Sequence, residues 1–252
     1  YNISGGVEFN GRIDHKKLSE AFKLVLNRHE IFRIAFVEKS EEPSTVLLDE
    51  ILFELKFADI SHHNDSELDN IAIEIQKAFE SEGFDLAKPP LLKAKLLYLN
   101  ANKTQLFVNM HHIISDGWSM SNFMRELGLA YKQVLGDNKA ELAPLKVQFL
   151  DYAYWQNEYK SSQSYQLEQS YWQIFCADAP LNSAIKPQLP KTSEVSYLGK
   201  SVQAKFSLTN SETLLAFAKQ QKTSLFNVLL ISYQLFIHGL TKLDDIVLGT
   251  DL

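Results

Sequence analysis

The chain has 252 residues, a length that allows either one large domain or two small ones. Hydrophobic residues make up 45% of it and charged residues 22%, a balance that is typical of folded proteins and excludes a disordered chain. The net charge of −6 gives no electrostatic reason to expect a nucleic-acid partner, and no apolar run approaches the roughly 20 residues that a membrane span needs.

The cysteine content and the two ends of the chain give further expectations. Cys176 is the only cysteine, which excludes an intramolecular disulfide and favours a reducing compartment such as the cytoplasm. The chain opens at Tyr1 without an initiator methionine or a signal-peptide pattern. Its last residues, DDIVLGTDL, resemble an interrupted strand, so we expect a piece of a longer polypeptide.

The first part of the chain alternates strand patterns with amphipathic helix patterns. The alternation in GGVEFNG predicts a strand, and Asp14 is a typical N-cap for the helix that follows it. Segments rich in β-branched and aromatic residues predict strands over Ile31–Glu38 and Thr45–Phe57. A second helix is expected from Asp65 or Ser66 to about residue 81. The apolar stripe of the first helix consists of Leu18, Phe22, Val25, Leu26 and His29.

The middle of the chain predicts a hairpin and three helices. The segments LLKAKLLYLN and TQLFVNM are expected to pair as an antiparallel hairpin around residues 101–103. An apolar stripe from Met120 to Val134 predicts a helix that ends near Gly136. Two aromatic-rich helices are expected over Val147–Lys160 and Gln163–Phe175.

The last part of the chain begins with a change in the sequence pattern. The segment Ala177–Gly199 holds three of the seven prolines and little periodicity, so we expect a linker. A strand is predicted over Val202–Leu208, then a helix from residue 210 or 211, and then an apolar helix over about Leu225–His238 that stops at Gly239. The alternation of strands and helices, with antiparallel hairpins, predicts mixed α/β layers.

The stretch NMHHIISDGWSM, Asn109–Met120, places two histidines and an aspartate between a strand pattern and a helix pattern. Met110 is expected to end the strand and Gly117 to open the helix. His111–Asp116 therefore form a strand-to-helix loop, where a rigid scaffold presents side chains to a ligand. Adjacent side chains on a strand point in opposite directions, so at most one histidine faces a given site. Free N–H groups at the helix start suit a developing oxyanion.

Other interpretations of this histidine pair stay open from the residues alone. His111 can be a satisfied core residue and His112 a solvent-facing one, and we interpret the second pair, His62-His63, as solvated because it lies in a polar turn. A metal site is not expected, because zinc needs three or four convergent ligands and adjacent histidines diverge. No G-x-S-x-G motif and no phosphate-binding glycine loop occur, and Cys176 is interpreted as a packed residue rather than a nucleophile.

The segment HHIISDG, His111–Gly117, resembles the HHxxxDG motif of the condensation domains of nonribosomal peptide synthetases. Chloramphenicol-acetyltransferase-like acyltransferases share this motif in looser form. RHEIFRIAF resembles a second family element, with Phe32 and Ile34 in place of Leu and Thr, and YWQIFCADAP resembles a third, with Cys176 and Asp178 as departures. The segment TSLFNVLLISYQLFIHGLTKLDDIVLGT resembles the second lobe, and DGWSM is similar to the peptide-bond-forming branch.

The resemblance implies a two-lobed α/β fold of the chloramphenicol acetyltransferase type, with the histidine motif at the lobe junction. In this chain we expect one lobe with a mixed sheet and flanking helices, plus a partial second lobe. Residues 1–176 would form the N-terminal lobe with the histidine motif, residues 177–199 the inter-lobe linker, and residues 200–252 the start of the C-terminal lobe. The family's full domain is longer, so the second lobe is expected to be incomplete in this chain.

The resemblance also implies an enzyme of antibiotic or other secondary-metabolite biosynthesis that forms an amide bond. A donor acyl or peptidyl thioester and the amine of an acceptor aminoacyl group would both arrive on the 4'-phosphopantetheine arms of peptidyl carrier domains. An adenylation domain is the expected neighbour. No intrinsically bound cofactor or metal, no nucleic acid and no membrane are expected as partners.

Residue roles follow from the same resemblance. His112 is the expected general base or proton-positioning group, and His111 the expected packed, hydrogen-bonded support. Asp116 could be a second base, but we expect it to pair with an arginine and to fix the loop. Arg33 is the expected partner and Arg28 the second choice, because an arginine inside a strand needs an opposite charge.

Two further residues and two further functions belong to these expectations. Gly117 is expected to offer its N–H to the tetrahedral intermediate, and Trp118 is assigned to packing, with channel lining as the alternative. The chain could instead be a non-catalytic lobe that docks carrier or adenylation domains. It could also be a stand-alone acyltransferase of the same fold that uses coenzyme A.

Overall fold

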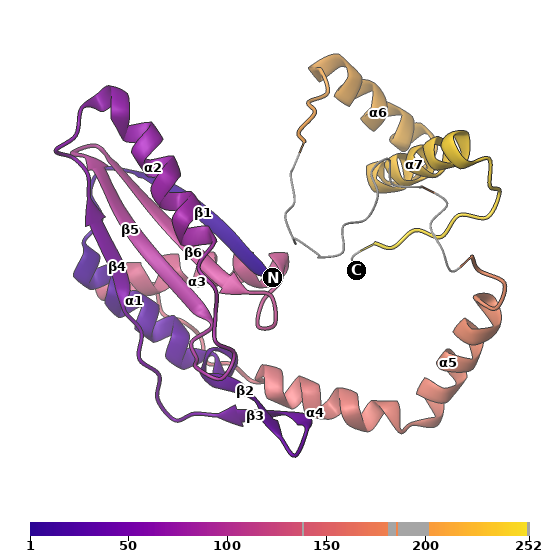
Figure 1. The fold of residues 1–252 in the computed structure, drawn as a ribbon, viewed down its shortest axis with the longest axis horizontal. Coiled ribbons are helices and arrows are strands. Elements are labelled where there is room, and N and C mark those ends of the chain that lie inside the picture. The colour runs from indigo at the N-terminus through magenta and orange to yellow at the C-terminus, as the bar shows by residue number, and fades with distance from the viewer. Residues whose placement is uncertain (138, 181–184, 186–201, 251–252) are drawn as a thin grey trace, which may run out of the picture. The chain divides into compact units, whose positions relative to one another are not determined.

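The computed structural model describes residues 1–137, 139–180, 185 and 202–250. The chain forms two compact units, residues 1–161 and 162–252 (Figure 1). This division assigns helix α5 (Gln163–Phe175) to the second unit, whereas the expected N-terminal lobe ends at residue 176. The expected linker at 177–199 lies mostly outside the described residues, so the lobe boundary stays a prediction.

The first unit is built on a four-stranded sheet in the order β1-β6-β5-β4. Strands β1, β6 and β5 are antiparallel neighbours, and β4 runs parallel to β5 through a crossover that contains helix α2. The element bounds are β1 Asn2–Asn10, β4 Leu55–Asp59, α2 Asp65–Glu80, β5 Leu92–Asn100 and β6 Lys103–His111. The predicted first strand, second helix and hairpin are therefore confirmed.

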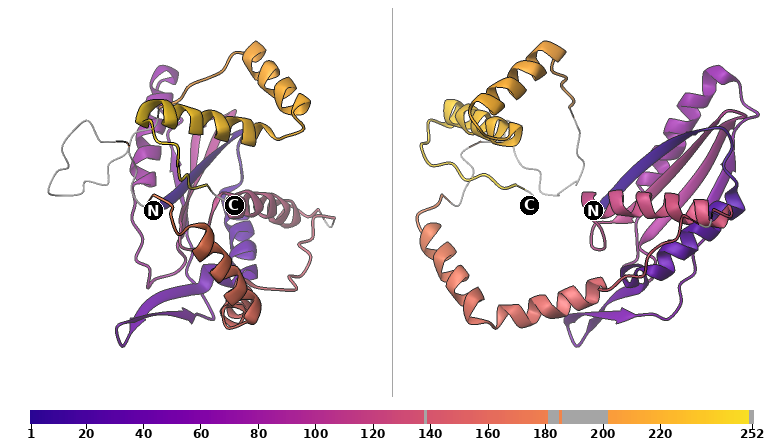
Figure 2. Two further views of the ribbon diagram at one scale, coloured as in Figure 1. Left: turned by 90° about the vertical axis from the view of Figure 1, so that its right-hand side faces the viewer. Right: turned by 180° about the vertical axis from the view of Figure 1, so that it is seen from behind.

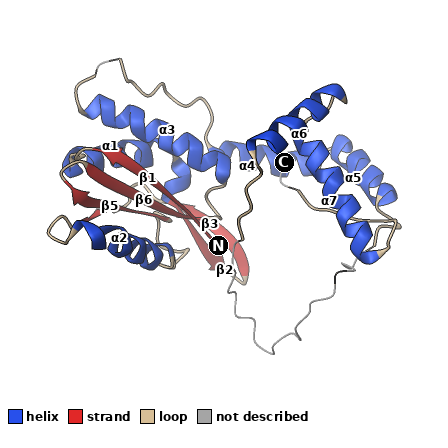
Figure 3. Cartoon of the chain, turned by 90° about the horizontal axis from the view of Figure 1, so that it is seen from above, coloured by secondary structure: helices blue, strands red, loops and turns tan. Residues whose placement is uncertain are grey.

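Helices cover both faces of this sheet (Figure 2 and Figure 3). Helices α1 (His15–Arg28) and α3 (Gly117–Val134) pack side by side on one face, and α2 packs on the other. Alternation along β6 supplies both layers: Leu106, Val108 and Met110 join the core under α1 and α3, while Phe107 joins the core under α2.

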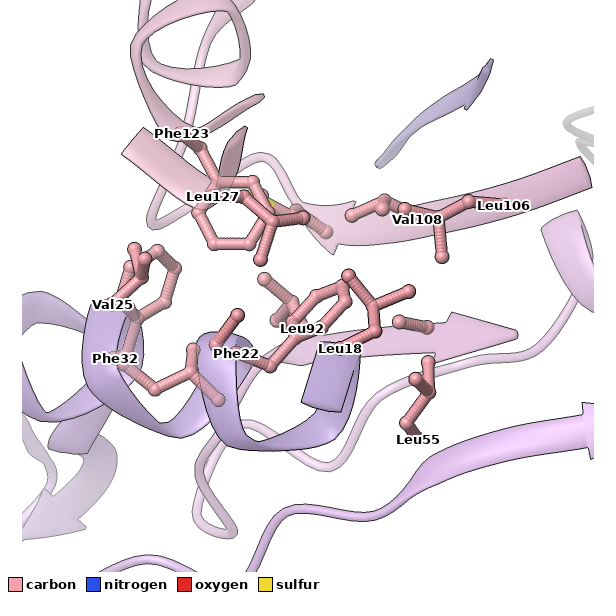
Figure 4. Close-up of a cluster of buried hydrophobic side chains, with 14 of the residues drawn as sticks. Leu18, Phe22, Val25, Phe32, Leu55, Leu92, Leu106, Val108, Phe123 and Leu127 are labelled. Carbon is pink, nitrogen blue, oxygen red and sulfur yellow. The ribbon is translucent and has the colours of Figure 1, made fainter. Parts of the chain in front are cut away.

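The larger core joins helix α1, the turn that follows it and helix α3 (Figure 4). Phe22 is fully buried and lies 5.8 Å from Phe123, ring centroid to ring centroid, and Phe123 lies 5.6 Å from Phe32. Asp14 caps α1 as predicted, because its carboxylate accepts hydrogen bonds from the N–H groups of the first turn. Tight aromatic packing of this kind gives the loops at this end a rigid support.

Two predicted strands are shorter than expected. Residues 30–33 form a 3₁₀ turn, η1 (Glu30–Arg33), and only the following residues form β2 (Ile34–Lys39). The long segment predicted as one strand divides into β3 (Glu42–Leu47), which pairs with β2 in a separate two-stranded sheet, and β4 of the main sheet. Composition alone indicates extended structure here, whereas the pairing partners decide where each strand begins and ends.

Helix α4 (Phe149–Lys160) completes the first unit and contacts η1. The second unit contains α5, α6 (Leu208–Gln220) and α7 (Leu225–Thr241), of which α6 and α7 contact each other. Among the described residues no single helix is long and apolar enough to cross a membrane, although α6 and α7, bent by 102°, pass a test of length and composition as a pair.

Three expectations for the second unit are wrong. No strand forms over residues 202–207, where the described chain offers no pairing strand, and Ser207 instead caps α6 through its hydroxyl. Helix α7 continues past Gly239, because Lys242 takes the left-handed conformation (φ 61°) and its N–H closes the helix on the His238 carbonyl. The final residues 244–250 form no strand in the described chain.

Candidate active site

The strand that leads to the histidine motif is held from both sides. Asn109 is fully buried, and its amide donates to the carbonyl oxygens of Phe79 and Glu80 at the end of α2 and accepts from the Ser4 hydroxyl of β1. At the end of β6 the His111 N–H donates to the carbonyl of Leu91, the residue just before β5, over 3.0 Å. The motif therefore begins at a fixed strand end rather than on a free loop.

A tight turn converts this strand end into the start of α3. The His111 carbonyl accepts hydrogen bonds from the Ile114 N–H (3.1 Å) and the Ser115 hydroxyl (3.1 Å), and both of these residues are buried. The His112 N–H donates to the Tyr1 carbonyl over 2.7 Å. This arrangement leaves the His112 side chain exposed at the tip of the turn.

The His111 side chain supports the turn. Its Nδ1 accepts a hydrogen bond from the Ile113 N–H over 3.0 Å, and the Phe84 ring meets the imidazole edge-on. An Nδ1 that accepts places the ring proton of the neutral imidazole on Nε2. Partial burial, the positive charge of the N-terminus at Tyr1 and the neighbouring His112 lower the pKa of His111 below its usual value. These contacts agree with the expected supporting role, and whether His111 takes part in the chemistry stays a prediction.

The lowered pKa of His111 can be measured directly. In an NMR titration of the folded protein, we expect the His111 ring to titrate below the usual value of about 6.5, because burial disfavours its charged form. The neutral ring also holds the Ile113 N–H, so the turn should loosen as the pH falls through this titration. The control is the same ring in the urea-unfolded protein. A folded midpoint at or above the unfolded one would contradict the account.

The His112 side chain lines a cavity of about 490 Å³ beside the turn. Apolar side chains form much of its wall: Phe32 and Phe123 belong to the core, and the exposed Phe149 comes from the start of α4. The polar lining comes from residues of the turn, the first turns of α3 and the end of α1. These residues are His29, His112, Ser115, Asp116, Ser119 and Asn122. The described residues therefore bring one histidine of the motif to a largely apolar cavity, as strand alternation predicts.

Asp116 also lines the cavity and is the N-cap of α3. Its Oδ1 accepts a hydrogen bond from the Ser119 N–H (2.7 Å) and another from the Ser119 hydroxyl (2.6 Å). These two bonds lower the pKa of Asp116 below its usual value, so the carboxylate is ionised and its proton affinity is low. The geometry favours a structural role for Asp116 over that of a second base.

The expected pairing of Asp116 with an arginine is wrong for the described chain. Arg33 lies in the η1 turn rather than inside a strand, and its guanidinium donates to the carbonyl oxygens of Leu48 and Asp49 after β3. Arg28 is engaged by another carboxylate, Glu126. The carboxylate of Asp116 is instead satisfied locally, within the first turn of its own helix.

Removing this cap should destabilise the site. Asp116→Ala is expected to lower the free energy of unfolding by about 1 kcal/mol, because the first turn of α3 loses the acceptor for its N–H groups. The midpoint of urea denaturation measures this loss. Asp116→Asn is the matched control, since asparagine caps a helix about as well as aspartate. Unchanged stability of the alanine variant with lost activity would instead favour a direct catalytic role.

The structure places the next two residues outside the cavity lining. In the described part of the chain the Gly117 N–H has no hydrogen-bond partner, and a side chain at this position would meet nothing within 4 Å. Trp118 is 79% exposed, so its assignment to packing is wrong within the described residues. Its position on the outer side of the first turn of α3 explains the difference, because the apolar stripe of that helix begins at Met120 and Phe123.

Two polar residues of the site are missed by the sequence patterns. Periodicity places His29 in the apolar stripe of α1, but its ring lines the cavity and its Nε2 lies 2.6 Å from Glu126 Oε2. Glu126 is 7% exposed and sits between Phe123 and Leu127 on the buried face of α3. A glutamate inside an apolar stripe is the available signal, because a carboxylate is seldom buried without a partner.

Comparisons with known proteins agree with this geometry. A model of the condensation domain family matches residues 1–252. A linear gramicidin synthase chain of Brevibacillus parabrevis is 31% identical over 250 residues, which are 99% of this chain and 5% of that protein. Bacitracin synthase 2 of Bacillus licheniformis is 30% identical over 253 residues, 100% of this chain and 9% of that protein.

Solved structures show the same fold. The protein SgcC5 from Streptomyces globisporus superposes with a TM-score of 0.79 at 24% identity, over 98% of this chain and 55% of that one. The first condensation domain of the calcium-dependent antibiotic synthetase superposes with a TM-score of 0.78 at 21% identity, over 98% of this chain and 56% of that one. The predicted mixed α/β fold is therefore confirmed.

These comparisons also bound what can be said of the whole protein. The chain spans less than a tenth of the curated relatives and about half of the solved domains. The match to the family model nevertheless runs from the first residue to the last, and the predicted resemblance is confirmed over that length. The chain belongs to the condensation-domain family.

Proposed function

We propose that this chain belongs to an enzyme that forms an amide bond in the nonribosomal synthesis of a peptide, in the cytoplasm. The nitrogen of an acceptor aminoacyl group attacks the carbonyl of a donor thioester, a C–N bond forms, and the C–S bond breaks. Both substrates are carried on the phosphopantetheine arms of peptidyl carrier domains, and an adenylation domain is the proposed neighbour. Kinship with synthases of gramicidin and bacitracin supports a product of that antibiotic class.

The observation that carries the proposal is the separation of the two histidines. His111 is turned into the loop and bonded to its backbone, while His112 stands at the wall of the cavity. An imidazole with a free nitrogen can accept the proton that the acceptor nitrogen loses as the amide forms. The proton then passes to the departing thiolate, which leaves as a thiol, so charge and protons balance.

The remaining motif residues take supporting roles in the proposal. Asp116 caps α3 and holds the turn that presents His112. The Gly117 N–H, at the positive end of the α3 dipole, is the proposed donor to the oxyanion of the tetrahedral intermediate. Its open surroundings leave room for a substrate to approach the backbone, which supports this assignment.

The experiment that tests the function uses the full-length condensation domain with two loaded carriers. Donor and acceptor carriers bearing different aminoacyl groups are mixed with the domain, and dipeptidyl product on the acceptor carrier is measured by mass spectrometry. Product formation supports the proposal. Product only when the donor is offered as a coenzyme A thioester would favour a stand-alone acyltransferase. Binding of carriers without product from either donor would favour a docking lobe.

A further inference from the structure

A second imidazole borders the cavity at the end of α1. His29 follows the last residue of this helix, and its Nε2 donates to Oε2 of Glu126 over 2.6 Å. The same carboxylate oxygen accepts from Arg28 Nε over 3.2 Å. The Glu126 side chain is 9% exposed, that of Arg28 15% and that of His29 28%, so the most exposed member of the group is the one that faces the cavity.

The backbone on both sides of His29 is held by one side chain. The Gln148 amide nitrogen donates to the Arg28 carbonyl (3.0 Å), and its amide oxygen accepts from the Glu30 N–H (3.2 Å). The Phe32 ring lies edge-on to the imidazole at 6.0 Å between centroids. Among the described residues Nδ1 has no hydrogen-bond partner. The ring is thus fixed in orientation while one of its nitrogens stays available, which is how binding sites present a polar group.

His29 and His112 line the same cavity from different elements, His29 from the end of α1 and His112 from the turn before α3. The cavity lining follows α3 from Asp116 to Phe123, and Glu126, which holds His29, lies in the next turn. Ten residues separate Asp116 from Glu126, which is about 15 Å along a helix axis at 1.5 Å per residue. A thioester beside His112 therefore leaves its attached chain, rather than its carbonyl, to meet His29.

We propose that His29, oriented by Glu126, is a substrate-binding residue that accepts a hydrogen bond from an amide N–H of the carrier-bound chain in the cavity. The Nε2–H group donates its hydrogen bond to Glu126. In the neutral ring Nδ1 is therefore an acceptor, which suits an N–H donor on the substrate. The amide belongs either to a peptidyl donor or to the arm that carries a substrate. Both present the same chemistry, an amide N–H in the chain that is attached to the thioester. The inference rests on the proposed function.

The test is a double-mutant cycle that combines a substitution of His29 in the protein with N-methylation of an amide in the substrate. The full-length domain and its His29→Phe variant are assayed for kcat/KM with matched substrates that carry an amide N–H or an N-methyl amide. One series methylates the amides of a tetrapeptidyl donor one at a time, and the other methylates the amides of the donor's and the acceptor's pantetheine arms one at a time. His62→Phe is the matched control, because His62 is exposed and lies outside the cavity lining.

We expect methylation at one position to lower kcat/KM of the wild type and of His62→Phe about tenfold, the size of one lost hydrogen bond to an uncharged group, and that of His29→Phe less than about twofold. General damage to the site would lower kcat/KM equally for the N–H and the N-methyl substrate, and the ratio of the two values would equal that of the wild type. The inference is overturned if methylation lowers kcat/KM equally in the wild type and in His29→Phe, or if methylation at no position lowers kcat/KM of the wild type. The proposed function is unaffected by either result. No product from the wild type with any substrate overturns the function, and the inference with it. If His29→Phe does not fold, His29→Met takes its place.

Discussion

Replacing His112 by alanine is expected to slow amide formation by about 10²- to 10⁴-fold in a single-turnover assay, the usual contribution of a general base. His112 is the motif histidine that reaches the cavity, so its loss removes the proposed acceptor of the amine proton. The reaction should not be abolished. An α-amine with a pKa of about 7.7–8.0 is partly unprotonated near neutral pH, and holding it against the thioester supplies about 7–11 kcal/mol by itself.

The variant must be compared with a histidine of similar exposure that lies elsewhere. His62→Ala provides this control, since both side chains are exposed but only His112 lines the cavity. Neither substitution should change the free energy of unfolding by more than about 0.5 kcal/mol, as is usual for exposed positions, so a slower reaction cannot be assigned to unfolding. His112→Ala at the full wild-type rate would refute the assignment of the general base.

Local patterns predict those parts of the fold that local interactions determine. The cap at Asp14 and the helix after it depend on residues within one turn, and the hairpin of β5 and β6 depends on alternation around a short loop. The strand end, predicted at Met110 and found one residue later at His111, and the helix start, predicted and found at Gly117, belong to this class too. Where neighbours in space are also neighbours in sequence, periodicity contains the information.

Contacts between distant segments are predicted poorly, for a physical reason. The family resemblance predicts that Asp116 pairs with an arginine, and charge selects Arg33. Neither says whether a nearer donor such as Ser119 satisfies the carboxylate first. The contact of His29 with Glu126 joins residues 97 positions apart. Spacing within a helix shows that both lie on apolar stripes, but not that the two stripes face each other.

Loss of the buried carboxylate of Glu126 should be the most damaging of the stability changes considered for this site. Glu126→Ala is expected to lower the free energy of unfolding by about 3 kcal/mol, because it leaves the Arg28 guanidinium, 15% exposed, without its opposite charge. The His29 ring loses its partner in the same step. The midpoint of urea denaturation, followed by far-UV circular dichroism on the full chain, measures the loss.

Two variants separate the charge of Glu126 from its volume and its helix position. Glu126→Gln keeps the side-chain volume and a hydrogen-bond acceptor but not the charge. Its free energy of unfolding should therefore lie between those of the wild type and Glu126→Ala. Glu74→Ala removes an exposed glutamate of α2 that forms no ion pair among the described residues, and it should change stability little. Equal losses for Glu126→Ala and Glu74→Ala would show that the contacts with Arg28 and His29 add no stability. The group at the end of α1 would then hold His29 in orientation without holding the fold together, a division of roles that buried ion pairs allow because their desolvation offsets their attraction.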